Sequence, residues 1–113
     1  MAPEILDRRV TFVKGIFQET LLDFLKSFNR KNRMVIHIDA DLYSSTLFVL
    51  SSMHYYLKDG DIIMFDDFLD PLGEFMAFSN YCQAFRIKLR IISAVKYGKL
   101  SDKASFMVTN NEQ

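Results

Sequence analysis

Two apolar runs in this chain end abruptly at acidic residues, and no other feature constrains the fold as strongly. The first run leads to Asp39 and Asp41, and the second leads to Asp66 and Asp67. A buried strand of a parallel sheet reads as a continuous apolar run, and ligands bind outside the carboxyl ends of such strands. The sequence therefore predicts two neighbouring strands whose tips place these carboxylates around one crevice.

Length and charge limit the protein classes that fit. The chain has 113 residues, enough for one domain with a modest core, and 14 basic against 14 acidic residues give a formal net charge of zero. This balance indicates neither a nucleic-acid partner nor a membrane surface, and no apolar run is long enough to span a bilayer. The single cysteine excludes an internal disulfide, and no signal-peptide pattern is seen, so we expect a cytoplasmic protein.

Residue periodicity predicts strands that alternate with helices. Strands are expected at residues 9–14, 34–38, 62–65, 91–95 and 105–108. Helices are expected at residues 20–28, from Ser44 or Ser45 to 57, and at 73–89. Thr20 is expected to cap the first of these helices, and one of the two serines is expected to cap the second. Gly60 is expected to adopt a left-handed conformation in the turn after the second helix. Strands that alternate with helices favour an α/β fold with a parallel sheet. The last two strands are joined without a helix, so one of them is expected to be antiparallel.

The acidic strand tips suit a hard cation. Mg²⁺ binds oxygen ligands, commonly one or two carboxylates together with waters and substrate oxygens. In a simpler interpretation, Asp66 or Asp67 caps the next helix and Asp41 is solvated. His37 alternates within a strand and is interpreted as a core or sheet-face residue rather than a ligand. Cys82 lies on the apolar stripe of the third helix and is expected to be a buried, inert thiol.

The glycines form no phosphate-binding motif. They stand at positions 15, 60, 73 and 98, and neither the dinucleotide fingerprint nor the P-loop spacing occurs among them. The segment present therefore lacks a loop that could cradle a phosphate.

Residues 37–46 and 58–68 together resemble the C-terminal half of class I S-adenosylmethionine-dependent methyltransferases, in particular the macrocin O-methyltransferase-like group. The pattern of that group is an apolar strand ending in Ile-Asp-x-Asp-Leu-Tyr-x-Ser-Thr, a turn with Gly, and a strand ending in Asp-Asp-Tyr or Asp-Asp-Phe. Residues 14–21 also resemble the segment that precedes these motifs. The resemblance covers about residues 9–108 and depends on the pair of motifs rather than on either alone.

The resemblance implies a fold, an activity and a set of site residues. The fold would be a partial Rossmann-like class I methyltransferase sheet, mostly parallel with an antiparallel closing strand, flanked by helices. The activity would be cation-assisted transfer of a methyl group from S-adenosylmethionine to a hydroxyl of a small-molecule substrate. By position, Mg²⁺ or another divalent cation would be held by Asp39, Asp66 and Asp67. The cofactor would contact Gly15, Phe17 and Asp39.

Two departures from the family pattern qualify this expectation. Several cation-dependent members have a Lys three residues after the first Asp, where this chain has Leu42, so the catalytic residue stays unassigned. The Gly-rich loop and the ribose-binding acid of the family would lie upstream of the residues present. We therefore expect residues 1–113 to form a single partial domain that lacks the cofactor-binding front half and is inactive alone. Segment 9–14 would then be displaced, unpaired or moved into a vacated slot, and the exposed sheet edge would favour self-association.

Two other classes of function stay open. The chain could be a non-catalytic remnant or a segment of a split protein, which the missing front half favours. It could also be a haloacid-dehalogenase-like phosphohydrolase, in which Asp39 would be the nucleophile. Tyr43 and the short spacing to Asp66 disfavour that second alternative.

Overall fold

The computed structural model of the chain describes residues 6–40, 42–66, 68, 72–97 and 101–110. Its elements, in chain order, are α1 (Phe17–Lys26), β1 (Val35–Ile38), α2 (Tyr43–Met53), the 3-10 helix η1 (His54–Tyr56), β2 (Ile62–Phe65), α3 (Glu74–Phe85), β3 (Lys88–Tyr97) and β4 (Ser101–Asn110). Within this part of the chain, no helix is long and apolar enough to cross a membrane.

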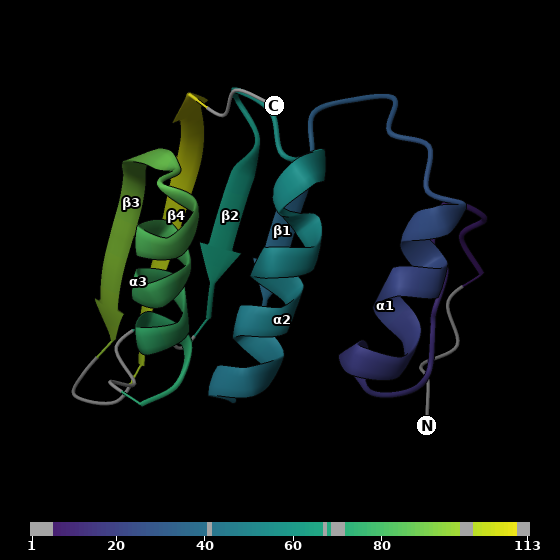
Figure 1. Cartoon of the computed structure of the whole chain (residues 1–113), viewed down its shortest axis with the longest axis horizontal. Helices are drawn as coiled ribbons and strands as arrows, with labels where there is room; N and C mark the ends of the chain where they lie inside the picture. The colour runs from purple at the N-terminus through teal and green to yellow at the C-terminus, as the bar shows by residue number, and fades with distance from the viewer. Residues whose placement is uncertain (1–5, 41, 67, 69–71, 98–100, 111–113) are drawn as a thin grey trace.

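The strands form one mixed sheet in the order β1-β2-β4-β3 (Figure 1). β1 and β2 are parallel, with Ile38 opposite Phe65. β4 is antiparallel to both of its neighbours, β2 and β3. The prediction of a mostly parallel sheet with an antiparallel closing strand is therefore confirmed.

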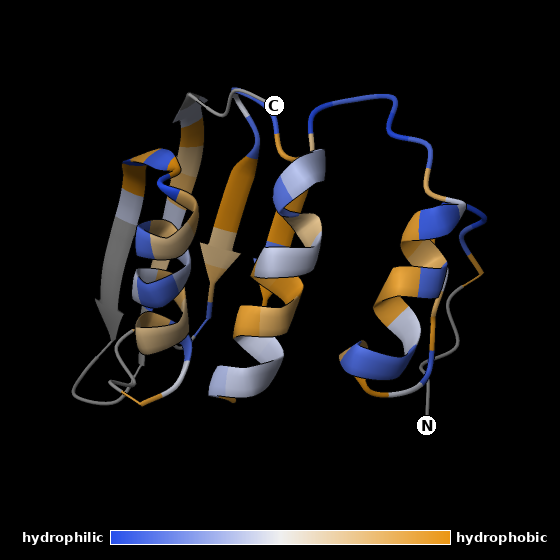
Figure 2. Ribbon diagram, in the orientation of Figure 1, coloured by the Kyte–Doolittle hydropathy of each residue, from blue (hydrophilic) through white to orange (hydrophobic). Residues whose placement is uncertain are grey.

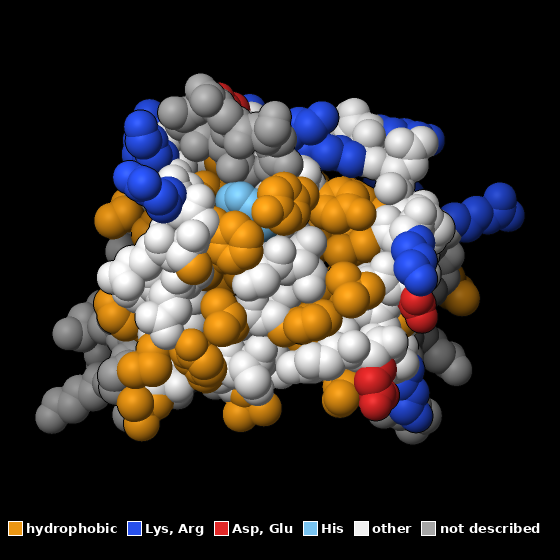
Figure 3. Space-filling view, viewed as in Figure 1, with side chains coloured by type: hydrophobic (Ala, Val, Ile, Leu, Met, Phe, Trp, Pro, Cys, Tyr) orange, Lys and Arg blue, Asp and Glu red, His pale blue; other side chains and the backbone are white. Residues whose placement is uncertain are grey.

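Helices α2 and α3 lie side by side on one face of this sheet, and the hydrophobic core lies between the two layers (Figures 1 and 2). Ile38, Ile63 and Phe65 alternate with more exposed residues along β1 and β2 and are buried in this core. Aromatic rings fill its centre, with Phe65 and Phe106 both packed against Phe78 at centroid distances of 4.9 and 4.6 Å. Seen from the helical side, hydrophobic side chains form scattered patches and charged ones lie near the margins (Figure 3).

The opposite face of the sheet is open in the part of the chain that the structure describes. Val35 of β1 is 56% exposed and Met64 of β2 is 38% exposed, because no described helix covers them. The outer edge of β1 is likewise without a described partner strand. Sheets with parallel strands are normally covered on both faces. A complete α/β fold would therefore have a second layer of helices over this face.

Segment 9–14 forms no strand, so that prediction is wrong, although the expectation that the segment would be unpaired is confirmed. Val10, Phe12 and Val13 are all exposed. β-branched and aromatic residues favour strands because they pack on a pleated surface beside a paired strand. These residues meet no such surface, and the segment stays irregular.

The predicted helix ends also differ from the observed ones. Thr20 is not a cap: α1 begins three residues earlier, and the Thr20 hydroxyl donates to the carbonyl of Ile16. No side chain caps α2, which follows Leu42 in extended conformation. α3 ends at Phe85 because Arg86 adopts a left-handed φ of 56°, and the residues expected to end that helix begin β3. Cys82 is partly buried against the core, and burial raises the pKa of its thiol to about 11.

A buried ion pair joins the connector before β1 to the turn before β2. The Asp61 carboxylate is fully buried and accepts hydrogen bonds from the Arg30 guanidinium through both oxygens. It also accepts the backbone N–H groups of Met34 and Lys58, at 3.0 and 2.7 Å. Burial alone would raise the pKa of Asp61, but these four bonds outweigh it and hold the pKa below its usual range. Asp61 is therefore ionised, and both of its carboxylate oxygens accept hydrogen bonds.

Replacing Asp61 with alanine is expected to lower the free energy of unfolding by about 3–5 kcal/mol, because the partly buried Arg30 charge and two N–H groups would lose their acceptor. Chemical denaturation followed by circular dichroism measures this change. Asp23→Ala, at an exposed position on α1, is the matched control and should change stability by no more than about 0.5 kcal/mol. Equal effects of the two substitutions would contradict the prediction.

The stability of the chain is expected to fall below neutral pH because of His54. Its ring is buried, with Nδ1 2.8 Å from the Tyr81 hydroxyl, and burial lowers the pKa of His54. Since the folded pKa lies below the unfolded value of about 6.5, the unfolded chain binds more protons as the pH drops through that value. The unfolding free energy should therefore decrease between about pH 7.5 and pH 5.5. His54→Gln should flatten this dependence, and an unchanged pH dependence in that variant would contradict the prediction.

Candidate active site at the strand tips

The carboxyl ends of β1 and β2 lie next to each other at one edge of the sheet. The backbone N–H of Asp66 donates to the carbonyl of Ile38 at 3.2 Å, so Asp39 and Asp66 directly follow two paired strands. Asp39 is exposed, and the Asp66 side chain is 29% exposed. The structure thus places these two predicted site residues at adjacent tips. The other two acids of the motifs, Asp41 and Asp67, lie outside the described residues.

Two basic side chains from the open face of the sheet meet Asp66. The Lys103 ammonium of β4 donates to Oδ1 of Asp66 at 2.7 Å, and Nε2 of His37 in β1 lies 3.5 Å from the same oxygen. The Lys103 ammonium, with a smaller effect from His37, holds the pKa of Asp66 below its usual range. His37 is 54% exposed, in agreement with its interpretation as a sheet-face residue. No pattern in the sequence indicated Lys103, which lies 37 residues from Asp66 along the chain.

A buried carboxylate supports the turn after β1. Glu74, the first residue of α3, is fully buried, and its Oε2 accepts the backbone N–H of Ala40 at 3.1 Å. The first turn of a helix is a favourable place for an acidic side chain, because the free N–H groups there carry partial positive charge. Glu74 therefore joins the start of α3 to the residue that follows Asp39. Glu74 lies at the start of the helix predicted at residues 73–89, but no sequence pattern indicated its contact with Ala40.

A second contact joins the same motif to α3. The side-chain amide of Asn80 donates to the hydroxyl of Tyr43, the first residue of α2, at 2.8 Å. The backbone N–H of Leu42 donates to the carbonyl of Ala40 at 2.7 Å, which tightens the turn between β1 and α2. Two residues of α3, Glu74 and Asn80, therefore contact the segment that follows Asp39.

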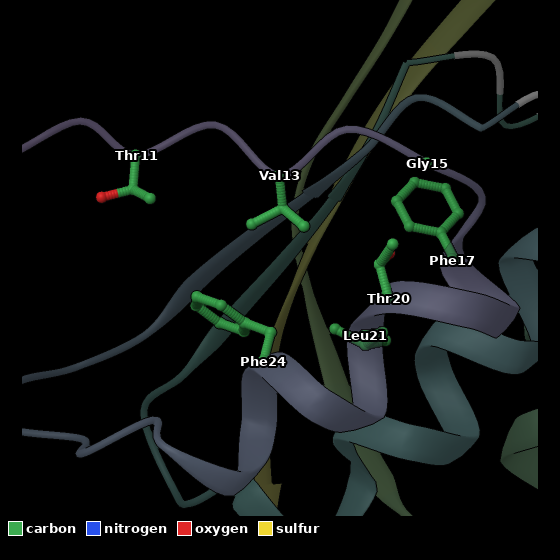
Figure 4. Close-up of a pocket in the computed structure, with 7 residues that line it drawn as sticks. All are labelled: Thr11, Val13, Gly15, Phe17, Thr20, Leu21 and Phe24. Carbon is green, nitrogen blue, oxygen red and sulfur yellow. The ribbon is translucent and has the colours of Figure 1, made fainter.

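A pocket of about 220 Å³ lies between the N-terminal segment and α1 (Figure 4). Its lining residues are Thr11, Val13, Gly15, Phe17, Thr20, Leu21 and Phe24. Gly15 has a φ of +139°, and a Cβ there would lie 2.7 Å from the methyl group of Thr20, so the position requires glycine. Two of the predicted cofactor contacts, Gly15 and Phe17, share this pocket. Asp39 is not among the lining residues, so the structure does not gather all three around it.

The donor set at the strand tips fits a hard divalent cation in part. In the described ranges, no three His, Cys, Asp or Glu side chains converge on a point that could hold a metal ion. Asp39 and Asp66 supply two carboxylates, and Mg²⁺ commonly uses one or two together with waters. The third predicted ligand, Asp67, falls outside those ranges. The chemistry of the two placed donors suits Mg²⁺, with the Lys103 ammonium already on one of them.

Comparisons with known proteins agree with the motifs and the sheet order. The sequence matches the macrocin-O-methyltransferase (TylF) family over residues 2–98. No curated protein sequence is significantly similar to the chain. The O-methyltransferase NovP superposes with a TM-score of 0.72 and 24% identity, over 93% of this chain and 40% of NovP. The TDP-rhamnose 3′-O-methyltransferase CalS11 of calicheamicin biosynthesis superposes with a TM-score of 0.64 and 27% identity, over 84% of this chain and 39% of CalS11.

The chain spans about two fifths of the length of each of these two structures. The family match covers most of the sequence and includes both acidic motifs. The superpositions agree with the predicted partial Rossmann-like sheet. The predicted resemblance is thus confirmed, and the chain belongs to the macrocin-O-methyltransferase family.

Proposed function

We propose that this chain is part of an S-adenosylmethionine-dependent O-methyltransferase that methylates a hydroxyl group of a small molecule. The family match carries the proposal, and the acids on the paired tips of β1 and β2 support it. A sugar hydroxyl, as named for CalS11, is a suitable first acceptor to test. The family match also argues against the phosphohydrolase alternative. A cytoplasmic location is part of the proposal, in keeping with the single cysteine.

The proposal assigns a divalent cation, most simply Mg²⁺, to Asp39, Asp66 and Asp67. When bound, such a cation would lower the pKa of the acceptor hydroxyl and orient its oxygen. Asp66 is suited to this role because it directly follows β2, beside the tip of β1. The bond between Glu74 and the backbone of Ala40 would hold the turn beside Asp39 in place. A turn that is already fixed by such a hydrogen bond needs little rearrangement when the cation binds.

The proposed cofactor contacts on this chain are Gly15, Phe17 and Asp39. The pocket at Gly15 and Phe17 has mostly apolar walls, which suit one face of an adenine ring. No charged side chain is among its lining residues, so it offers no partner for the carboxylate of the cofactor. The remaining cofactor contacts would come from a part of the fold outside residues 1–113.

We further propose that residues 1–113 form a single partial domain. The chain covers about two fifths of NovP and CalS11, and its sheet has an open face and a free β1 edge in the described part. The front half of a methyltransferase fold would cover both. Without it, the β1 edge offers unpaired backbone groups, and the proposed result is self-association. The same observations favour the alternative of a non-catalytic segment of a split protein.

One experiment separates catalysis from the non-catalytic alternative. The chain is joined behind the front half of CalS11, and formation of S-adenosylhomocysteine is measured with TDP-rhamnose as the probe acceptor. Methyl transfer that stops with a chelator and returns with Mg²⁺ is the expected result. Activity that is unchanged in the chelator would exclude the cation role. A folded chimaera that binds the cofactor but transfers no methyl group would favour the non-catalytic segment.

A further inference from the structure

The Lys103 ammonium occupies the carboxylate that the proposed metal site needs. Its Nζ lies 2.7 Å from Oδ1 of Asp66, a short charge-assisted hydrogen bond. The pair lies on the open face of the sheet, with the Lys103 side chain 51% exposed and the Asp66 side chain 29% exposed. In this arrangement Asp66 already has a positive partner before any cation binds.

The position of Lys103 follows from the register of the closing strand. In the antiparallel pairing of β2 with β4, Phe65 lies opposite Ala104. Asp66 and Lys103 are the next residues outward on each strand. Ala104 is buried toward the helices. Its neighbour Lys103 therefore projects to the opposite face, because successive side chains of a strand alternate.

We propose that Lys103 is an internal counter-ion of Asp66 that a divalent cation must displace, so that Lys103 limits the cation affinity of the strand-tip site. The inference rests on the proposed cation-assisted function and adds a residue that tunes it. An ammonium and a divalent cation on one carboxylate would repel each other at short range. The lysine stem is long and its side chain is half exposed, so the ammonium can turn toward solvent.

The ammonium and the cation compete for the same carboxylate, and this competition sets the size and direction of the expected change in cation affinity. The free energy of a partly exposed ion pair changes an equilibrium constant by a factor of about two to five. Removal of the repulsion between the ammonium and the cation adds to this factor. Loss of the Lys103 charge should therefore raise cation affinity by about three- to tenfold, reduced at high salt because both effects are screened.

The test is a titration of the 113-residue chain with Mn²⁺, in which the electron paramagnetic resonance signal of the free ion reports binding. Lys103→Met should raise the affinity by about three- to tenfold, and Lys103→Arg should leave it near the wild-type value. Lys88→Met is the matched control, because it removes the same charge from an exposed residue at the far end of the β3–β4 pair and should have little effect. Asp66→Asn should abolish the gain from Lys103→Met.

Mg²⁺ titration followed by the NMR signal of the lysine ammonium gives a second readout. The Lys103 signal should shift as the cation releases it from Asp66, while the Lys88 signal should stay unchanged. If wild type binds Mn²⁺ and Lys103→Met binds it no more tightly, the counter-ion role is wrong while the metal site stands. If neither wild type nor Lys103→Met binds Mn²⁺, the metal site and the counter-ion role both fail.

Discussion

The isolated 113-residue chain is expected to bind S-adenosylmethionine at least about a thousandfold more weakly than the same chain joined to a methyltransferase front half. The cofactor is charged and polar, whereas the pocket beside Gly15 and Phe17 offers mostly apolar walls and no charged side chain. Charge-assisted hydrogen bonds contribute roughly 1.5–3 kcal/mol each, and about 1.4 kcal/mol corresponds to a tenfold change in affinity. Loss of two or three such bonds therefore accounts for the expected difference.

Isothermal titration calorimetry of the purified chain and of the chimaera measures this ratio, with size-exclusion chromatography to establish the oligomeric state. Phe17→Ala is an informative control in both proteins. It should weaken binding to the chimaera through loss of an apolar wall without unfolding it, because Phe17 is 41% exposed and is not one of the buried core residues. Micromolar binding to a monomeric isolated chain would contradict the prediction. If Phe17→Ala then removed that binding, the pocket on this chain would be sufficient for the cofactor.

Replacing Asp66 with alanine in the chimaera is expected to lower kcat/KM by about 10²- to 10⁴-fold, since a cation that stabilises developing charge contributes several kcal/mol. Asp66 is the proposed ligand that the structure places at the tip of β2, beside the tip of β1. The loss should be accompanied by weaker Mn²⁺ binding. It should not be accompanied by unfolding, because the pair with Lys103 is partly exposed and such pairs contribute little to stability.

Asp23→Ala is the matched control for this substitution. Asp23 lies on α1 and forms an exposed ion pair with Lys26, so its replacement removes the same charge far from the strand tips. Activity within about twofold of the parent is expected, as for most surface substitutions. Equal activities of the Asp66 and Asp23 variants, or a chelator-resistant activity in the parent, would remove Asp66 from the proposed mechanism.

Local patterns in the sequence predicted the strand tips well. The bounds of β2, Ile62–Phe65, agree with the prediction because four apolar residues lie between a glycine turn and an acidic pair. Gly60 has the expected left-handed conformation, with a φ of +93°. The placement of Asp39 and Asp66 at neighbouring tips follows from the same pattern, since parallel strands end at one edge of a sheet.

Patterns that depend on a distant partner were predicted poorly. Segment 9–14 has strand-forming residues, yet a strand exists only where another strand satisfies its backbone groups, and none does so here. The sequence predicts that the apolar stripe of α3 continues to Leu89, because the spacing from Phe85 to Leu89 also fits a helix. In the structure Arg86 breaks the helix, and Leu89 enters β3 opposite Val108.

The sequence by itself determined the α/β class, the two acidic strand tips and, through their paired motifs, the macrocin-O-methyltransferase family. Only the tertiary structure decided which side chains meet at those tips. Lys103 reaches Asp66 across 37 residues of sequence, and Glu74 reaches the backbone of Ala40 across 34. Such contacts depend on the register of an antiparallel strand and on how a helix packs over a strand end. Those are properties of distant segments brought together by burial of the core, and no local periodicity encodes them.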